Sequence, residues 1–285
     1  MSKTTNLKVK IFADGADRAR MLDLYQDPRI VGFTTNPTLM RLAGVTNYEA
    51  FARDLLLVIA DRPISLEVFS DSFDEMEAQA HQIASWGENV YVKIPVTNTE
   101  GQSSLPLIRA LARAKVKQNV TALMTLEQVR EVSEALADGP SSYVSVFAGR
   151  VADTGRDPLP LIAASVNQLA MYPQLELIWA SPRELLNIVQ ANQVGCHIIT
   201  VTYDLIRKLD LINKDLDEYS LETVRMFRGD AVAAGFQLDP VGFTNASTLS
   251  KLNSQFYPET LPNQPAISEN ARPSELPQAI GAMNS

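Results

Sequence analysis

Residues 90–122 read VYVKIPVTNTEGQSSLPLIRALARAKVKQNVTA and contain one complete strand–helix–strand unit. The unit starts with a β-branched apolar run, Val90–Pro95, continues with an amphipathic stretch, Leu105–Ala114, and ends with a second apolar run, Val116–Ala122. Strands that alternate with helices predict parallel βαβ connections, because the helix returns the chain to the starting edge of the sheet. This stretch therefore predicts an α/β fold.

The same alternation extends in both directions along the chain. Eight βα units predict a closed (β/α)8 barrel, the TIM barrel. A doubly wound open sheet is the alternative, but that fold typically has a Gly-rich first turn, which this sequence lacks. The eight apolar runs are Val9–Ala13, Val31–Thr35, Ile64–Phe69, Val90–Pro95, Val116–Ala122, Tyr143–Ala148, Leu175–Ser181 and Cys196–Thr202. Helices are expected at Tyr48–Ile59, Phe73–Trp86, Leu105–Ala114, Leu126–Leu136, Pro158–Tyr172 and Pro182–Asn192.

The chain of 285 residues is long enough for one large α/β domain. After the eighth run comes one more helical stretch, about Leu221–Gly235. The composition then changes, because residues 255–285 hold many Pro, Asn and Ser and few large apolar side chains. We therefore predict a single barrel domain over residues 1–240 and a largely irregular C-terminal extension over residues 241–285.

Composition excludes several classes of partner. The formal net charge of -8 disfavours binding to nucleic acid or to an anionic membrane surface. No apolar run reaches the length that spans a bilayer, and Met1–Leu7 lacks the apolar stretch of a signal peptide. We therefore expect a cytoplasmic protein, and the sequence leaves homo-oligomer formation open.

Composition also restricts the chemistry. The one cysteine, Cys196, excludes an internal disulfide and a Cys-rich zinc site, and two histidines cannot build a three-His zinc site. Neither a Gly-x-Gly dinucleotide motif nor a Gly-Lys-Ser/Thr phosphate loop is present. We therefore expect no metal and no cofactor. The chemistry of an enzyme of this composition must come from Lys, carboxylate, hydroxyl and amide groups.

Polar side chains follow or interrupt seven of the eight apolar runs near their C-terminal ends. In a (β/α)8 barrel these ends form the face at which reactive groups gather. A random scatter of surface polar residues would seldom produce this pattern. The residues are Asp14, Thr34, Thr35, Asn36, Glu67, Lys93, Asn119, Thr121, Ser145, Arg150, Ser181 and Arg183.

Lys93 is the most informative of these residues, because it is the only charged residue in Val90–Val96. A single Lys at a strand end would ordinarily extend its ammonium to solvent. In a dry barrel interior, however, burial disfavours the ammonium, and a neutral amine attacks a ketone to form a Schiff base. The Schiff base withdraws electrons and promotes cleavage of a neighbouring C–C bond. Glu67 and Asp14 are the carboxylates that could move the protons.

Local alternatives exist for four of these side chains. Asn36 precedes Pro37 and has the pattern of a helix N-cap, and Asp14 stands where it could cap the next helix. The guanidinium groups of Arg150 and Arg183 suit phosphate oxygens, but surface ion pairs are more common for single arginines. Asp153, three residues after Arg150, is a candidate local partner for it.

Seven separated motifs resemble, in order, those of the transaldolase family, which includes the fructose-6-phosphate aldolases. The resemblance spans about residues 9–235. The motifs are Phe12-Ala-Asp14, Gly32-Phe-Thr-Thr-Asn-Pro37, Ser65-Leu-Glu-Val68, Tyr91-Val-Lys-Ile-Pro-Val-Thr97, Asn119-Val-Thr121, Ser145-Val-Phe-Ala-Gly-Arg150 and Ala180-Ser-Pro-Arg183.

The resemblance implies a role for each site residue. Lys93 would form a Schiff base with a ketose phosphate, and Asp14 would take the proton of the donor C4 hydroxyl as the C3–C4 bond breaks. Glu67 and Thr121 would hold a catalytic water. Substrate contacts are implied for Thr34, Asn36, Asn119, Ser145, Phe147, Arg150, Ser181 and Arg183, of which Arg150, Ser181 and Arg183 would bind phosphate.

The implied activity is that of a transaldolase of the pentose phosphate pathway. It would move a dihydroxyacetone unit from sedoheptulose 7-phosphate or fructose 6-phosphate to an aldose phosphate, so that its partners are small-molecule sugar phosphates. The resemblance implies that the transaldolase branch carries Glu and Phe where the free-aldolase branch carries Gln and Tyr. This chain has Glu67 and Phe147 at those positions. A lyase that releases free dihydroxyacetone, and a non-catalytic descendant that binds sugar phosphates, are the alternatives.

Overall fold

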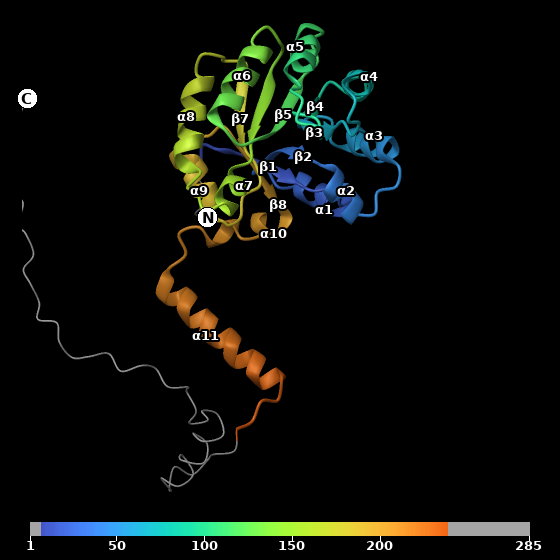
Figure 1. The fold of residues 1–285 in the computed structure, drawn as a ribbon. Helices are drawn as coiled ribbons and strands as arrows, with labels where there is room; N and C mark the ends of the chain where they lie inside the picture. Colours follow the sequence, from blue (N-terminus) through green and yellow to red (C-terminus); the bar gives the residue numbers. More distant parts are fainter. Residues whose placement is uncertain (1–6, 239–285) are drawn as a thin grey trace, which may run out of the picture. The chain divides into compact units, whose positions relative to one another are not determined.

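The computed structural model describes residues 7–238 and contains a closed barrel of eight parallel strands (Figure 1). The strands are paired in sequence order from β1 to β8, and β8 pairs with β1. This confirms the predicted TIM barrel, with strand limits within two residues of the apolar runs. The strands are β1 (Lys10–Asp14), β2 (Ile30–Thr34), β3 (Ile64–Glu67), β4 (Val90–Pro95), β5 (Gln118–Leu123), β6 (Ser142–Val146), β7 (Leu175–Trp179) and β8 (Ile198–Thr202).

The helices that connect the strands surround the barrel (Figure 1). The expected helix at Pro182 begins four residues later, because the backbone N–H groups of Arg183 and Glu184 bond to Asn187 Oδ1 instead of starting a helical turn. The helices are α1 (Arg18–Tyr25), α2 (Pro37–Leu42), α3 (Tyr48–Val58), α4 (Phe73–Ala84), α5 (Leu105–Arg113), α6 (Leu126–Leu136), α7 (Ala148–Asp153), α8 (Leu159–Leu169), α9 (Leu186–Gln193), α10 (Tyr203–Ile206), the 3₁₀ turn η1 (Leu209–Leu211) and α11 (Leu216–Ala233).

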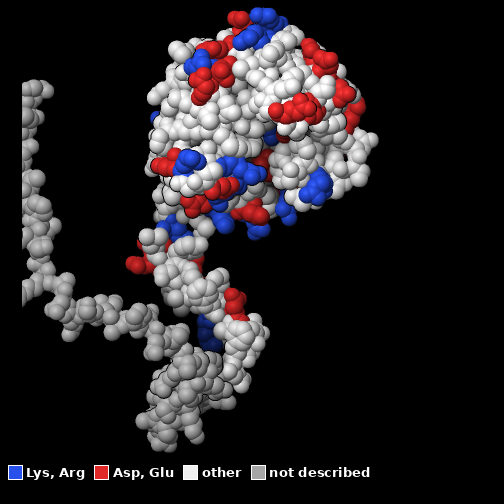
Figure 2. All heavy atoms as spheres, in the orientation of Figure 1, with Lys and Arg blue, Asp and Glu red and all other residues white. Residues whose placement is uncertain are grey.

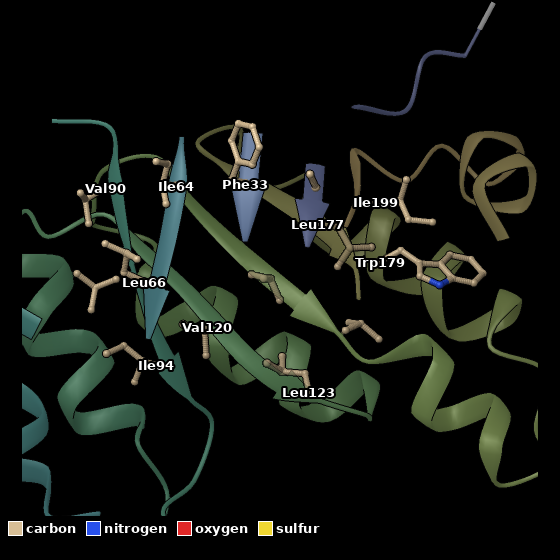
Figure 3. Packing of buried hydrophobic residues seen from close by; sticks show 14 of the residues in the cluster. Phe33, Ile64, Leu66, Val90, Ile94, Val120, Leu123, Leu177, Trp179 and Ile199 are labelled. Carbon is tan, nitrogen blue, oxygen red and sulfur yellow. The ribbon is translucent and has the colours of Figure 1, made fainter. Parts of the chain in front are cut away.

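The larger part of the core lies between the strands and the helices. Alternate strand residues point outward against the apolar faces of the helices, as Figure 3 shows for Leu66, Ile94 and Trp179. These side chains are fully or almost fully buried. Burial of this apolar layer is the main stabilising contribution to the barrel.

A second, smaller cluster fills the interior of the barrel. Phe12 packs edge-on against Tyr143, with ring centroids 5.6 Å apart, and Tyr143 stacks on Tyr91 at 4.1 Å. Gly32 makes room for the Phe12 ring, because a Cβ atom at Gly32 would lie 2.5 Å from it. The cluster consists of Phe12, Tyr91, Tyr143, Ile178, Ala180 and Ile198.

This interior cluster supports the polar residues above it. Asp14, Lys93, Ser145 and Thr200 each follow a cluster member by two positions, so they point into the barrel one step closer to the C-terminal strand ends. The interior therefore changes from apolar to polar at the end of the barrel where (β/α)8 enzymes have their sites.

The chain divides into two compact units, one up to Tyr219 and one from Ser220 onward. The second unit, as far as the structure describes it, is mainly the remainder of α11, a helix without buried side chains. The division lies before residue 240, the predicted end of the barrel domain. The predicted irregular extension, residues 241–285, lies outside the described residues.

Acidic and basic side chains intermingle on the face of the barrel that Figure 2 shows. Within residues 7–238, no helix has the length and apolarity needed to cross a bilayer.

Candidate active site

The polar groups at the C-terminal strand ends surround a cavity of about 480 Å³. Every residue to which the family resemblance gives a role lines this cavity except Arg183. Thr35, a further candidate at a strand end, does not line it; this residue is buried, and its Oγ1 donates to the Ser65 carbonyl at 3.0 Å. The barrel closure brings these groups together although they are spread over more than 180 positions of the sequence. The lining residues are Asp14, Thr34, Asn36, Pro37, Thr38, Leu39, Glu67, Lys93, Asn119, Thr121, Ala122, Ser145, Phe147, Arg150, Ala180, Ser181 and Thr200.

Lys93 is buried at the end of β4 and points into the cavity. Its Nζ lies 3.0 Å from Glu67 Oε2 and donates a hydrogen bond to the Thr35 carbonyl at 3.1 Å. The Tyr48 hydroxyl donates to the Glu67 carbonyl at 2.8 Å and so fixes the end of β3. A buried amine beside one carboxylate can exchange a proton locally, which is a requirement for Schiff-base chemistry.

Asp14 lies at the end of β1 and accepts a hydrogen bond from Thr34 Oγ1 at 2.7 Å. Asp17, not Asp14, caps helix α1, so the capping alternative for Asp14 is not what the structure shows. Burial raises the pKa of the Asp14 carboxyl above its usual value, while the charge of Lys93 and the Thr34 hydrogen bond act in the opposite direction. Asp14 is therefore placed to bind and return a proton.

Asn119 belongs to a fully buried hydrogen-bond chain across three strands. Its Nδ2 donates to Ser65 Oγ at 2.9 Å, and its Oδ1 accepts from Ser145 Oγ at 2.6 Å. These bonds fix the amide orientation and use one of its two N–H groups. The other N–H group can donate to a ligand in the cavity.

Thr121 follows Asn119 on the inner face of β5. Its Oγ1 is buried and has no hydrogen-bond partner among the described residues. Ala122, the next residue, has a positive φ of 67° at an irregularity in the pairing of β5 with β6. A buried hydroxyl without a partner is costly, and a ligand or a water molecule in the cavity could satisfy it.

Asn36 is the N-cap of α2, with its Oδ1 accepting from the Leu39 N–H at 3.0 Å. The local capping interpretation is therefore confirmed, and Asn36 also lines the cavity. Capping uses only the amide oxygen of Asn36, so its amide nitrogen can still donate to a ligand in the cavity.

Arg150 and Ser181 both line the cavity, where α7 and the loop after β7 are in contact. Gly149 permits this contact between α7 and the loop after β7, because a Cβ atom there would lie 1.6 Å from the Ser181 carbonyl oxygen. Ser181 itself has a positive φ of 61°, a conformation that is strained for a residue other than glycine. The approach of Gly149 to Ser181 therefore places Arg150 and Ser181 on neighbouring segments of the cavity lining, and a guanidinium and a hydroxyl together suit an anion.

Arg183 does not line the cavity, because Asp153 binds its guanidinium through two oxygens. This bond, with Arg150 at longer range, holds the pKa of Asp153 below its usual value. The Asp153 partner suggested by sequence proximity was Arg150, three residues earlier. The loop after β7 instead brings Arg183 to Asp153.

Two interior residues have contacts that the sequence did not indicate: Ser65 stands in a quoted motif without a role, and Thr200 in none. Ser65 bonds to Asn119, and Thr200 on β8 contacts Thr34. Thr200 lies two positions before the end of the eighth apolar run, so its position on the alternating pattern was the available signal. Pro37 and Ala180 lie within the quoted motifs without an expected role, and Thr38, Leu39 and Ala122 were not expected to line the cavity.

Cysteine and histidine lie away from this cavity. Cys196 is buried, and His197 Nδ1 accepts a hydrogen bond from the Leu177 N–H. In the part of the chain that the structure describes, no group of three or more His, Cys, Asp or Glu side chains is arranged to hold a metal ion.

Comparison with known proteins agrees with this geometry. Residues 11–244 match the family described as Transaldolase/Fructose-6-phosphate aldolase. The chain belongs to this family. A probable transaldolase of Streptococcus equi subsp. zooepidemicus (strain MGCS10565) is 34% identical over 70% of this chain and 90% of its own length. One of Methanococcus maripaludis (strain C7 / ATCC BAA-1331) is 31% identical over 75% of this chain and 94% of its own length.

These transaldolase relatives are matched over nearly their whole length, whereas a quarter or more of this chain lies outside each alignment. Among solved structures, that of 2,3-dimethylmalate lyase has a TM-score of 0.47 and 13% identity, over 89% of this chain and 96% of that chain. A similarity with so low a sequence identity and TM-score gives no information about function.

Proposed function

We propose that this chain is a transaldolase that transfers a dihydroxyacetone unit from sedoheptulose 7-phosphate or fructose 6-phosphate to an aldose phosphate through a Schiff base on Lys93. The main support for this proposal is the position of Lys93, which is buried with its Nζ 3.0 Å from Glu67 Oε2, in a cavity lined by hydroxyl and amide groups. Membership of the family supports an enzyme of this kind. A place in the pentose phosphate pathway and a cytoplasmic location belong to the same proposal.

In the first stage the Lys93 ammonium gives up a proton, and Glu67 is at a suitable distance to accept it. The neutral amine adds to the C2 carbonyl of the donor, and loss of water gives an iminium ion. Glu67 and Thr121 hold the water that carries protons at this stage. The buried Thr121 hydroxyl, without a partner among the described side chains, supports this role.

In the second stage Asp14 accepts the proton of the donor C4 hydroxyl. The electron pair of the C3–C4 bond moves into the iminium ion, so that an enamine remains on Lys93 and an aldose phosphate leaves. The enamine carbon then attacks the aldehyde of the acceptor, and Asp14 returns the proton. Because burial raises the pKa of Asp14, the carboxyl suits this reversible role.

Phosphate binding is assigned to Arg150 and Ser181 at the cavity edge, with Arg183 as a further contributor. Asn36, Asn119, Ser145 and Thr34 line the cavity, which supports their assignment to the sugar hydroxyls. Exposed ion pairs are weak, so a phosphate can compete with Asp153 for Arg183.

Transfer is favoured over release because Phe147 lines the cavity and has no hydroxyl to protonate the enamine. The test is to incubate the enzyme with fructose 6-phosphate, with and without erythrose 4-phosphate. We expect sedoheptulose 7-phosphate and glyceraldehyde 3-phosphate only when the acceptor is present. Fast release of dihydroxyacetone without acceptor would indicate the lyase, and saturable binding without turnover would indicate the non-catalytic descendant.

A further inference from the structure

We propose that Thr200 is a positioning residue for Asp14: its hydroxyl orients the Thr34 hydroxyl, which holds the Asp14 carboxylate ready to accept a proton. The catalytic consequence rests on the proposed function, whereas the effect on Asp14 itself can be measured without activity.

The three residues form a connected group on adjacent strands. Asp14 is on β1, which lies between β2, bearing Thr34, and β8, bearing Thr200. Thr34 Oγ1 donates to Asp14 Oδ1 at 2.7 Å and is in hydrogen-bond contact with Thr200 Oγ1. Thr34 and Thr200 are both buried, and all three residues line the cavity. The Thr34–Thr200 contact therefore joins β2 to β8 across the inner face of β1.

The number of available protons determines which hydroxyl donates in each of these hydrogen bonds. A threonine hydroxyl has one proton to donate and can accept further bonds. Since Thr34 gives its proton to Asp14, the contact between the two hydroxyls must use the proton of Thr200. The order is therefore Thr200 to Thr34 to Asp14, and it reverses when Asp14 holds a proton and donates it to Thr34. Successive hydrogen bonds polarise one another, so Thr200 strengthens the bond that Asp14 receives.

The surroundings of Asp14 make this bond important. Burial opposes ionisation of the carboxyl, and two influences favour ionisation: the charge of Lys93 and the hydrogen bond from Thr34. Thr200 acts on the second influence alone. Asp14 also borders an adjoining cavity of about 380 Å³. The charged groups that line either cavity with it are Glu67, Lys93 and Arg150 on one side and Asp17, Arg20 and Asp204 on the other.

Matched variants separate the hydroxyl from the shape of the side chain. Thr200→Val keeps the branched shape and removes the donor, whereas Thr200→Ser keeps the donor. Thr202→Val makes the same chemical change on the same strand at an exposed position. Thr200→Ala replaces the valine variant if valine prevents folding.

The direct experiment is a titration of the Asp14 carboxyl in the full-length protein by carbon-13 NMR of labelled aspartate. Loss of the signal in Asp14→Asn assigns it. We expect Thr200→Val to raise the titration midpoint by on the order of half a pH unit. Thr200→Ser and Thr202→Val should keep the wild-type midpoint. An unchanged midpoint in Thr200→Val, or an equal shift in Thr200→Ser, overturns the proposal.

Kinetics distinguish this inference from the proposed function. In Thr200→Val the acid limb of the kcat profile should shift in the same direction, with the KM for fructose 6-phosphate unchanged. A variant that merely weakened the fold would lower the melting temperature without moving the acid limb. Failure of the wild-type enzyme to form a Lys93 adduct would reject the transaldolase proposal, while the NMR titration would still decide the role of Thr200.

Discussion

Lys93 and Glu67 are register partners on the neighbouring parallel strands β4 and β3, and their charged ends lie 3.0 Å apart inside the barrel. The Val68 N–H donates to the Lys93 carbonyl at 3.1 Å, so the two strands stay paired beyond the two side chains. In the proposed mechanism Glu67 is therefore close enough to accept a proton from Lys93 as the amine adds to a donor ketone.

Asp14→Asn should stabilise the protein at neutral pH while abolishing transfer. Above the ordinary aspartate pKa of about 3.9 the unfolded chain carries an ionised Asp14, whereas burial opposes ionisation in the folded protein. The wild type therefore loses stability as the pH rises through the raised pKa of the folded state. Thermal unfolding should show a gain of a few degrees at pH 7.5 and none below pH ~3.5. A lower melting temperature at pH 7.5 would contradict the account.

Gly149→Ala should destabilise the protein by about 2 kcal/mol, since the new methyl group would overlap the Ser181 carbonyl. The loop after β7 would move away from Arg150, so the KM for fructose 6-phosphate should also rise. Gly229→Ala, on α11 with no atom within 4 Å of the added Cβ, is the control and should be neutral or slightly stabilising. Equal effects of the two changes in thermal unfolding would rule out the predicted overlap.

Arg150→Ala should raise the KM for fructose 6-phosphate about tenfold or more, because a charge-assisted phosphate contact is lost. Arg183→Ala should have the smaller effect, because Asp153 already binds that guanidinium. Steady-state kinetics with unphosphorylated fructose provide the control, where neither change should matter. A larger effect of Arg183→Ala would indicate that Arg183 leaves Asp153 when substrate binds.

Phe147→Tyr should increase release of free dihydroxyacetone relative to transfer. The added hydroxyl would face the cavity and could donate a proton to the enamine. The measurement is the ratio of acceptor-independent to acceptor-dependent turnover of fructose 6-phosphate. A ratio equal to that of the wild type would show that Phe147 does not determine the preference for transfer.

The barrel was predictable because its signals are local and repeated. Apolar β-branched runs such as Val90–Pro95 alternate with amphipathic segments such as Leu126–Leu136, and both coincide with the observed elements. The start of α9 was not predictable, since it depends on the side chain of Asn187 binding two backbone N–H groups before the helix.

The site was predictable to the extent that strand ends converge in any such barrel. The family resemblance added roles that the pattern alone could not give, such as those of Asn36 and Thr121. Thr200 and the Asp153–Arg183 pair escaped because they depend on contacts between distant segments. The alternating pattern places Thr200 on one face of β8, but the contact with Thr34 depends on the closure of the barrel.

The most direct test of the central claim is borohydride reduction of the enzyme with fructose 6-phosphate, followed by peptide mass spectrometry. We expect one reduced donor adduct on Lys93, and none in Lys93→Met. An adduct on a different lysine, or an adduct that persists in Lys93→Met, would contradict it.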